Sequence, residues 1–257
     1  FYAHGEGICH QILPEKGHVQ PGMLIVGSDS HTTTYGAFGA FSTGIGATEM
    51  ASVWATGELW FRVPETLRIN ITGPMPKGVS SKDVILGIIG RLGSDGADYM
   101  CVEYTGDAVD SMSVSSRMVM SNMAIEMGAK AGICFPDSKT MSYLEERGAN
   151  NGNPVMGDED AVTRTLDFPV SGLAPLVACP HAVDNVKEVS DLEGLRIDQA
   201  VLGSCTNGRL EDLEAAEAIT RGEKIPTNVR FIVVPASKEV YLEAMDRGII
   251  RSLMESG

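Results

Sequence analysis

The chain alternates between short apolar runs and polar, glycine-rich turns, and this pattern predicts an α/β fold. Residues 67–72 alternate apolar and polar side chains, as a strand does when it buries one face. After Ser80 or Ser81, apolar side chains recur at helical spacing up to Leu92, which predicts an amphipathic helix with a serine cap. The same criteria predict further strands at residues 23–26, 99–105 and 133–135, and further helices at residues 48–56, 115–127 and 138–147.

The clearest supersecondary unit lies near the end of the sequence. A strand at residues 197–202, a helix at 210–221 and a strand at 229–234 predict a βαβ unit. Cys205 lies in the loop between the first strand and the helix, where backbone N–H groups and the helix dipole stabilise a thiolate. Cys205 is therefore a candidate nucleophile or iron–sulfur ligand, and the structural alternative is a small residue that fills a tight loop.

A second polar cluster follows the apolar run at residues 23–26. Asp29, Ser30 and His31 come directly after it, where an α/β protein presents polar groups at the carboxyl edge of a strand. The alternative is that they only form a turn. A hydrolytic triad is not expected, because neighbouring side chains of an extended segment point to opposite faces and no G-x-S-x-G motif is present.

Several other motifs indicate structure more than chemistry. Residues 44–49 lack the third glycine of a dinucleotide loop, so the small residues at 36–46 favour close backbone packing or close approach to a ligand. The histidines and the cysteine within residues 4–18 do not have zinc-site spacing. Four methionines in the helix at 115–127 are typical of core filling. Glu103, in an apolar strand, either has a partner or lies on a solvated face.

Composition and charge narrow the function classes. The formal net charge of −14 argues against a nucleic-acid-binding surface, which needs a basic face. No apolar run is long enough to span a bilayer, so no membrane insertion is expected. The five cysteines are odd in number, widely spaced and without C-x-x-C, which favours a reducing cytoplasm. The N-terminus has no signal-peptide pattern and no Met, so the chain is expected to be part of a longer product.

Taken in order, the motifs resemble those of the aconitase family along essentially the whole chain. Within that family they are most similar to the branch of 3-isopropylmalate dehydratase and homoaconitase large subunits. The motifs that carry this resemblance are Gly7-Ile8-Cys9-His10-Gln11, Asp29-Ser30-His31-Thr32, Gly44-Ile45-Gly46, Trp60-Phe61-Arg62-Val63-Pro64-Glu65, Val102-Glu103-Tyr104 and Gly203-Ser204-Cys205-Thr206-Asn207. The resemblance implies three aconitase-type domains, with residues 1–64 from the first, 65–147 as the second, and 148–257 as a linker and the start of the third.

The resemblance also implies a hydro-lyase reaction. Family members move a hydroxyl group between adjacent carbons of a 2-hydroxy acid through an alkene. They use a [4Fe–4S] cluster held by three cysteines, whose open iron acts as a Lewis acid. Cys205 matches the first cluster cysteine. His10 matches an active-site histidine, and Glu103 matches the carboxylate expected to pair with it. Asp29, Ser30 and His31 match residues that line the site and the substrate.

The departures from the family pattern limit this expectation. The other two cluster cysteines form a C-x-x-C downstream of Cys205 in the family, and residues 206–257 contain none. In the isomerases the proton-abstracting serine lies on a separate small subunit, which is the expected partner. The chain is therefore expected to be a fragment of the large subunit, without an intact cluster and inactive by itself; a natural short paralogue is the alternative.

Several functions stay open at this point. The leading expectation is 3-isopropylmalate dehydratase of leucine biosynthesis, with homoaconitase or a dimethylmalate- or methylmalate-type dehydratase as alternatives. A cluster-free relative without enzymatic activity, either regulatory or nucleic-acid-binding, is a different class, and the net charge of −14 argues against it. A thiol hydrolase that uses Cys205 and His10 is a third class, and it would need no iron.

Overall fold

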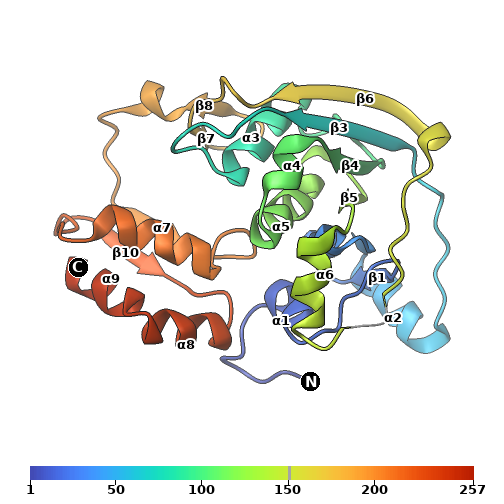
Figure 1. Ribbon diagram of the computed structural model, residues 1–257, viewed down its shortest axis with the longest axis horizontal. Coiled ribbons are helices and arrows are strands. Elements are labelled where there is room, and N and C mark those ends of the chain that lie inside the picture. The colour runs from blue at the N-terminus through green and yellow to red at the C-terminus, as the bar shows by residue number, and fades with distance from the viewer. Residues whose placement is uncertain (150–151) are drawn as a thin grey trace. The chain divides into compact units, whose positions relative to one another are not determined.

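The computed structural model describes residues 1–149 and 152–257. The chain divides into two compact units (Figure 1). Unit 1 combines Phe1–Glu15 with Gly194–Gly257, and unit 2 spans Lys16–Glu193. Both units mix helices with parallel strands, so the expected α/β class is confirmed. The expected domain boundaries at residues 64 and 147 both fall within unit 2, and the division into aconitase-type domains stays a prediction.

The main sheet of unit 2 has four parallel strands in the order β5-β4-β3-β6. Its core strand β3 buries Leu67, Ile69 and Ile71 completely, as the alternating pattern predicts. β6 runs beside β3 in Figure 1 and was not expected, because its side chains are mostly exposed and polar, as suits the edge of a sheet. The strands are β3 (Thr66–Thr72), β4 (Cys101–Thr105), β5 (Ala131–Cys134) and β6 (Val162–Pro169).

Helices pack on this sheet with their predicted apolar faces. The stripe of α3 is fully buried from Val84 to Ile89 and partly buried at Leu92. Ser80 caps this helix with the help of Asp83, whose carboxylate accepts the Ser80 N–H at 2.7 Å. The expected helix at 115–127 is α5 followed by a 3₁₀ turn, η2, and its methionines fill the core as predicted. The helical segments of this layer are α3 (Ser81–Leu92), α4 (Asp107–Ser111), α5 (Val114–Asn122), η2 (Met123–Met127) and α6 (Ser138–Glu145).

A smaller substructure of unit 2 carries the Asp29–His31 cluster. Its parallel strands β1 and β2 are joined by a 3₁₀ helix, η1, which packs on α5 and β5. Gly36 lies so close to β5 that a Cβ atom there would be 1.9 Å from the Gly132 carbonyl oxygen. At Gly36 the small side chain therefore permits close backbone packing, which was one of the two expectations for residues 36–46. The elements are β1 (Leu24–Gly27), η1 (Ser30–Phe38), β2 (Phe41–Gly44) and α2 (Ala47–Thr56).

The rest of unit 2 consists of short elements. An antiparallel pair, β7 and β8, packs beside α3. The expected polar linker at residues 148–160 lies partly outside the described residues, and it ends in the 3₁₀ turn η3. These elements are η3 (Glu159–Ala161), β7 (Leu176–Ala178), β8 (Val186–Glu188) and η4 (Val189–Leu192).

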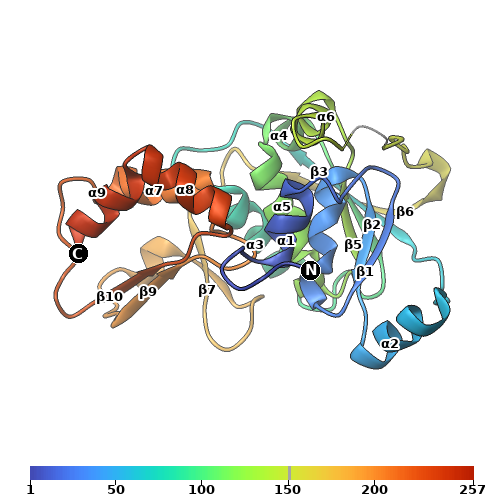
Figure 2. The ribbon, with the colours of Figure 1, turned by 90° about the horizontal axis from the view of Figure 1, so that it is seen from below.

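Unit 1 contains the predicted βαβ unit. β9 and β10 are parallel, and α7, α8 and α9 lie on one side of them (Figure 2). Helix α1 from the start of the chain joins this unit through hydrogen bonds such as Ile8 N–H to the Ala236 carbonyl, at 2.9 Å. The elements are α1 (Cys9–Glu15), β9 (Gln199–Leu202), α7 (Leu210–Thr220), β10 (Arg230–Val233), α8 (Lys238–Asp246) and α9 (Ile249–Ser256).

Across residues 1–149 and 152–257, the helices are all too short or too polar to cross a membrane.

Candidate functional site

His31 and Glu126 form a histidine–carboxylate pair in unit 2. The Nε2 atom of His31, on η1, lies 3.2 Å from Oε1 of Glu126, on η2. Their side chains are 27% and 30% exposed, so the pair lies at the surface of the core with one side open to solvent. Sequence reasoning predicted a site role for His31 but missed Glu126, which it treated as part of a core-filling helix.

Ser30 and Asp29 both contact His31, Ser30 at the imidazole and Asp29 at the backbone. Ser30 Oγ is 3.3 Å from His31 Nδ1, and the Asp29 carboxylate accepts the backbone N–H of His31 at 2.8 Å. The expectation that Ser30 and His31 diverge was wrong, because the chain turns into a 3₁₀ helix at Ser30 instead of staying extended. Asp29 is the N-cap of that helix. The structure therefore brings together the three residues that the sequence placed in one site.

Buried hydrogen bonds connect the two elements that carry the pair. Thr33 Oγ1 donates to the Asn122 carbonyl at 3.0 Å, and Asn122 Nδ2 donates to Thr34 Oγ1 at 2.7 Å. Thr33, Thr34 and Asn122 are fully buried, so these bonds form where an unsatisfied polar group would be costly. They hold η1 against the end of α5, and η2 follows directly with Glu126.

The pair shifts both pKa values in the direction of an ion pair. The hydrogen bond to Glu126 raises the pKa of His31; partial burial opposes this rise, and the charges of Glu126 and Asp29 support it. The hydrogen bond from His31 lowers the pKa of Glu126, again against the effect of burial. Because histidine has an ordinary pKa of 6.5, His31 is the side chain in this cluster best suited to take up and release a proton.

We expect these shifts to give a defined pH dependence of stability. The contribution of His31 is fully present below its ordinary pKa of 6.5 and is lost as the pH rises through its higher folded value. The contribution of Glu126 is present above its ordinary pKa of 4.5 and is lost as the pH falls through its lower folded value. Urea titrations give the free energy of unfolding of the wild type and of Glu126→Gln. The difference between the two should be largest between pH 4.5 and pH 6.5, where both contributions are present. A difference that is flat from pH 4 to pH 9 would contradict the ion pair.

Glu103 has a partner within unit 2. Its carboxylate accepts hydrogen bonds from Arg68 Nη2 at 3.0 Å and from Arg68 Nε at 3.2 Å. The two residues face each other in the β3–β4 register, and Arg68 also binds Glu159. Glu103 is 8% exposed, so the alternative of a solvated strand face was wrong. Because His10 belongs to unit 1, the expected pairing of His10 with Glu103 stays a prediction.

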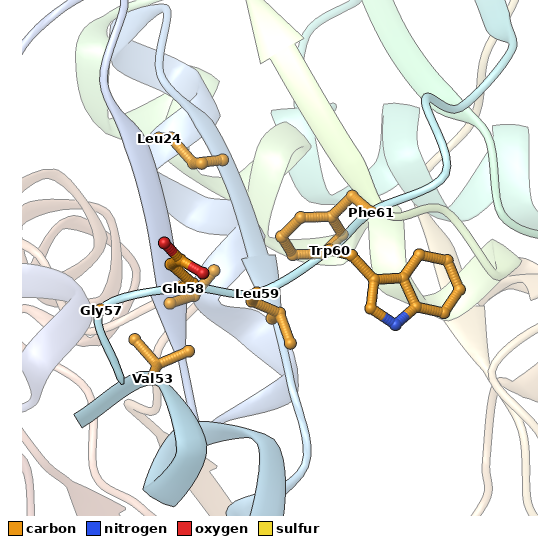
Figure 3. A pocket seen from close by; sticks show the side chains of 8 residues that line it. Leu24, Val53, Gly57, Glu58, Leu59, Trp60 and Phe61 are labelled. Atoms are coloured by element: carbon orange, nitrogen blue, oxygen red, sulfur yellow. The ribbon is translucent and has the colours of Figure 1, made fainter. Parts of the chain in front are cut away.

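Two cavities of unit 2 are mainly apolar. A cavity of about 270 Å³ lies beside Glu103 and is lined by side chains such as Phe41, Ile133 and Phe135. The other, of about 550 Å³, lies between β1 and the end of α2 (Figure 3). Its lining residues are Leu24, Val26, Val53, Gly57, Glu58, Leu59, Trp60 and Phe61. None of the predicted site residues lines this second cavity.

The loop that carries Cys205 connects β9 to α7 in unit 1, as predicted. Cys205 is half-buried. The preceding residue, Ser204, has a left-handed φ of 72°, and a Cβ atom at Gly208 would lie 2.9 Å from the Val234 carbonyl oxygen. The loop is therefore tight against the β10 end, and it presents Cys205 at the carboxyl end of β9, just before a helix begins.

Helix α1 places His10 in the same unit as Cys205. His10 is 3% exposed, and its neighbour Gln11 accepts a hydrogen bond from Arg209 Nε at 3.1 Å. Arg209 is the N-cap of α7 and also donates to the carbonyl oxygens of Cys205 and Thr206. Unit 1 thus connects the helix of His10 to the loop of Cys205. Sequence reasoning missed both Gln11 and Arg209.

Comparison with known proteins identifies the family. The family model described as "Aconitase family (aconitate hydratase)" matches residues 1–257. The chain belongs to the aconitase family. This confirms the resemblance that the motifs indicated.

Three relatives in this family show how much of a protein the chain covers. The whole chain is 56% identical to a probable 3-isopropylmalate dehydratase large subunit of Methanothermobacter thermautotrophicus and covers 62% of it. It is 53% identical to a probable methanogen homoaconitase large subunit of the same organism and covers 60% of it. The identity to the 3-isopropylmalate dehydratase large subunit of Nitratidesulfovibrio vulgaris is 48%, with 62% covered. The chain thus spans about three-fifths of the length of these aconitase-family relatives.

The cysteines of unit 2 test the fit of an aconitase-type cluster. Cys101 and Cys134 are buried, and burial raises the pKa of each thiol to about 12. Both are therefore poor ligands, because a metal binds the thiolate. In the described part of the chain, no three His, Cys, Asp or Glu side chains are grouped so that they could hold a metal ion. Cys205 fits the role of a single ligand, and residues 1–149 and 152–257 do not provide the set of three.

Proposed function

We propose that this chain is part of the large subunit of a hydro-lyase of the 3-isopropylmalate dehydratase type. Such an enzyme isomerises a 2-hydroxy acid by removing water and adding it back at the adjacent carbon. The observation that carries the proposal is in unit 1, where Arg209 hydrogen-bonds both the loop of Cys205 and the helix of His10. The names of the relatives support the same reaction class.

One residue of the described chain would bind the cofactor. Cys205 would be one ligand of a [4Fe–4S] cluster, and the rest of the ligand set is not among the described residues. When bound, such a cluster supplies a Lewis acid for the substrate hydroxyl.

The chain's own residues would bind the substrate and move a proton. His31 is held at Nε2 by Glu126, so its Nδ1 atom, next to Ser30 Oγ, is the ring nitrogen placed to exchange a proton with a ligand. A raised pKa keeps the ring protonated at higher pH, as donation to a departing hydroxide requires. Asp29 and Ser30 would contact the substrate. His10 and Glu103 are proposed to be catalytic on the family resemblance alone.

The partner and the substrate are part of the same proposal. The relatives are named as large subunits, which supports a small subunit as partner. We propose 3-isopropylmalate as substrate, leucine biosynthesis as the pathway, and the cytoplasm as the location. Homocitrate is the second candidate substrate, because a relative named as a homoaconitase is 53% identical to the chain, close to the 56% of the dehydratase.

The test uses the gene product that contains this chain, purified with its small subunit and reconstituted with iron and sulfide without oxygen. We expect 3-isopropylmalate to yield an alkene, detected by its ultraviolet absorbance, and Cys205→Ser to abolish both this activity and the visible absorbance of the cluster. Cys179→Ser is the matched control, since Cys179 lies in unit 2, and it should retain both. Preferred turnover of homocitrate would favour the homoaconitase alternative. Hydrolytic activity that depends on Cys205 but not on iron would refute the proposal.

A further inference from the structure

Arg209 is a buried cation whose side chain reaches in two directions. It is 3% exposed. Its Nη1 atom donates to the Thr206 carbonyl at 2.7 Å, and Nη2 donates to the Cys205 carbonyl at 3.0 Å. Its Nε atom donates to Gln11 Oε1, 198 positions away in the sequence, at 3.1 Å. The planar guanidinium can make these bonds at fixed relative angles, which a lysine cannot.

Gln11 continues the connection on the other side. Its Nε2 atom donates to Glu15 Oε2 at 2.9 Å, and the same oxygen accepts a hydrogen bond from Ser237 Oγ at 2.7 Å. Ser237 is the N-cap of α8. Gln11, Glu15 and Ser237 are at most 7% exposed. A buried polar network that is satisfied in this way favours one arrangement of the elements that it joins, because a shift of either leaves buried groups without partners.

The network ends at the loop between β9 and α7, where the backbone is strained at Ser204. Ser204 has a left-handed φ, and Cys205 and Thr206 turn their carbonyl oxygens to Arg209. Such a conformation costs energy at a non-glycine residue and persists only when its surroundings hold it. The guanidinium supplies two charge-assisted hydrogen bonds for this purpose, which are stronger than neutral ones.

We propose that Arg209 and Gln11 are positioning residues that hold the Cys205 loop in place against the helix of His10. Arg209 holds the two carbonyl groups, and Gln11 sets the position of Arg209 relative to α1. The purpose of this arrangement, to place a cluster ligand beside a catalytic histidine, rests on the proposed function. The mechanical coupling itself does not, because it exists in the chain without any cofactor.

Hydrogen–deuterium exchange with mass spectrometry on the 257-residue chain tests the coupling. In Arg209→Gln and in Gln11→Met, we expect amide exchange in the peptide covering residues 203–208 to rise about tenfold, as loss of a charge-assisted hydrogen bond implies. Exchange in β3 of unit 2 should be unchanged. Arg221→Gln is the matched control, because the Arg221 side chain is 72% exposed and its ion pair with Glu217 joins it to the preceding turn of the same helix. Exchange of the 203–208 peptide in this variant should equal that of the wild type.

A second readout separates positioning from general destabilisation. The rate of alkylation of Cys205, divided by that of Cys179 in the same sample, should rise several-fold in both test variants and stay constant in Arg221→Gln. Arg209→Lys should give intermediate values. Loop exchange within twofold of wild type in both test variants would overturn the proposal, and so would a rise in Arg209→Gln alone, because Gln11 would then have no part in it. These results are obtained without iron, so a failure of the dehydratase assay leaves them standing.

Discussion

Replacing Glu126 with glutamine is expected to lower the turnover number of the assembled, reconstituted enzyme about a hundredfold or more. Glutamine keeps the size of the side chain but removes the charge that raises the pKa of His31. The imidazole would then lose its proton at lower pH. His31→Gln should cost at least as much, because it removes the proton carrier itself.

The measurement is the steady-state rate of alkene formation as a function of pH. If Glu126 acts through His31, the double variant should be no slower than His31→Gln, since residues that act as a unit are not additive. Glu146→Gln is a suitable control in the same unit, because Glu146 is a surface carboxylate, 74% exposed at its side chain. A Glu126→Gln enzyme with wild-type turnover would exclude the pair from the reaction.

Replacing Arg117 with methionine is expected to destabilise unit 2 by about 1–3 kcal/mol, because the Asp137 side chain is 36% exposed and water can replace part of the lost partner. Arg117 is 1% exposed, and its guanidinium donates to Asp137 Oδ2 at 2.6 Å and to Thr140 Oγ1 at 3.1 Å. Burial alone would raise the pKa of Asp137, but the hydrogen bond from Arg117 and the N-cap bond from Thr140 lower it to about 2. Methionine fills a similar volume and leaves Asp137 and Thr140 without this partner.

Urea unfolding followed by circular dichroism at pH 7 measures this loss. The pKa of Asp137 is depressed, so its contribution is present above the ordinary value of 3.8 and is lost as the pH falls through about 2. The difference between wild type and variant should therefore shrink only below that ordinary value. Arg91→Met is the control, because Arg91 is exposed and donates to a single carbonyl, so less than about 1 kcal/mol is expected. A comparable loss in both variants would refute the special role of Arg117.

Elements defined by local patterns could be predicted from the sequence. The alternation of β3, the apolar stripe of α3 and the βαβ unit around Cys205 each depend on residues close together in the chain. The same holds for the position of Cys205 after β9. These features follow from periodicity and turn residues, which can be recognised within a short stretch of the sequence.

Features that depend on distant pairing could not be predicted in this way. Glu126 meets His31 across 95 positions, and Arg209 meets Gln11 across 198. Glu126 did give one signal, a carboxylate among the buried methionines, and such a group needs a partner. Arg68 gave another, since a charged side chain in β3 would face Glu103 once the register is known. The 3₁₀ conformation after Ser30 could not be told from an extended one, because its three threonines are common in strands.

The burial of Cys101 and Cys134 affects which thiols of the folded protein can be oxidised. Peroxide reacts with thiolates. Thiols with a pKa of about 12 are almost entirely protonated at cellular pH, so they react slowly. Thiol oxidation of the folded chain is therefore expected at Cys9, Cys179 and Cys205, while the two core thiols stay reduced until the sheet opens. Oxidised Cys101 or Cys134 would therefore mark a molecule in which the sheet opened in the presence of an oxidant.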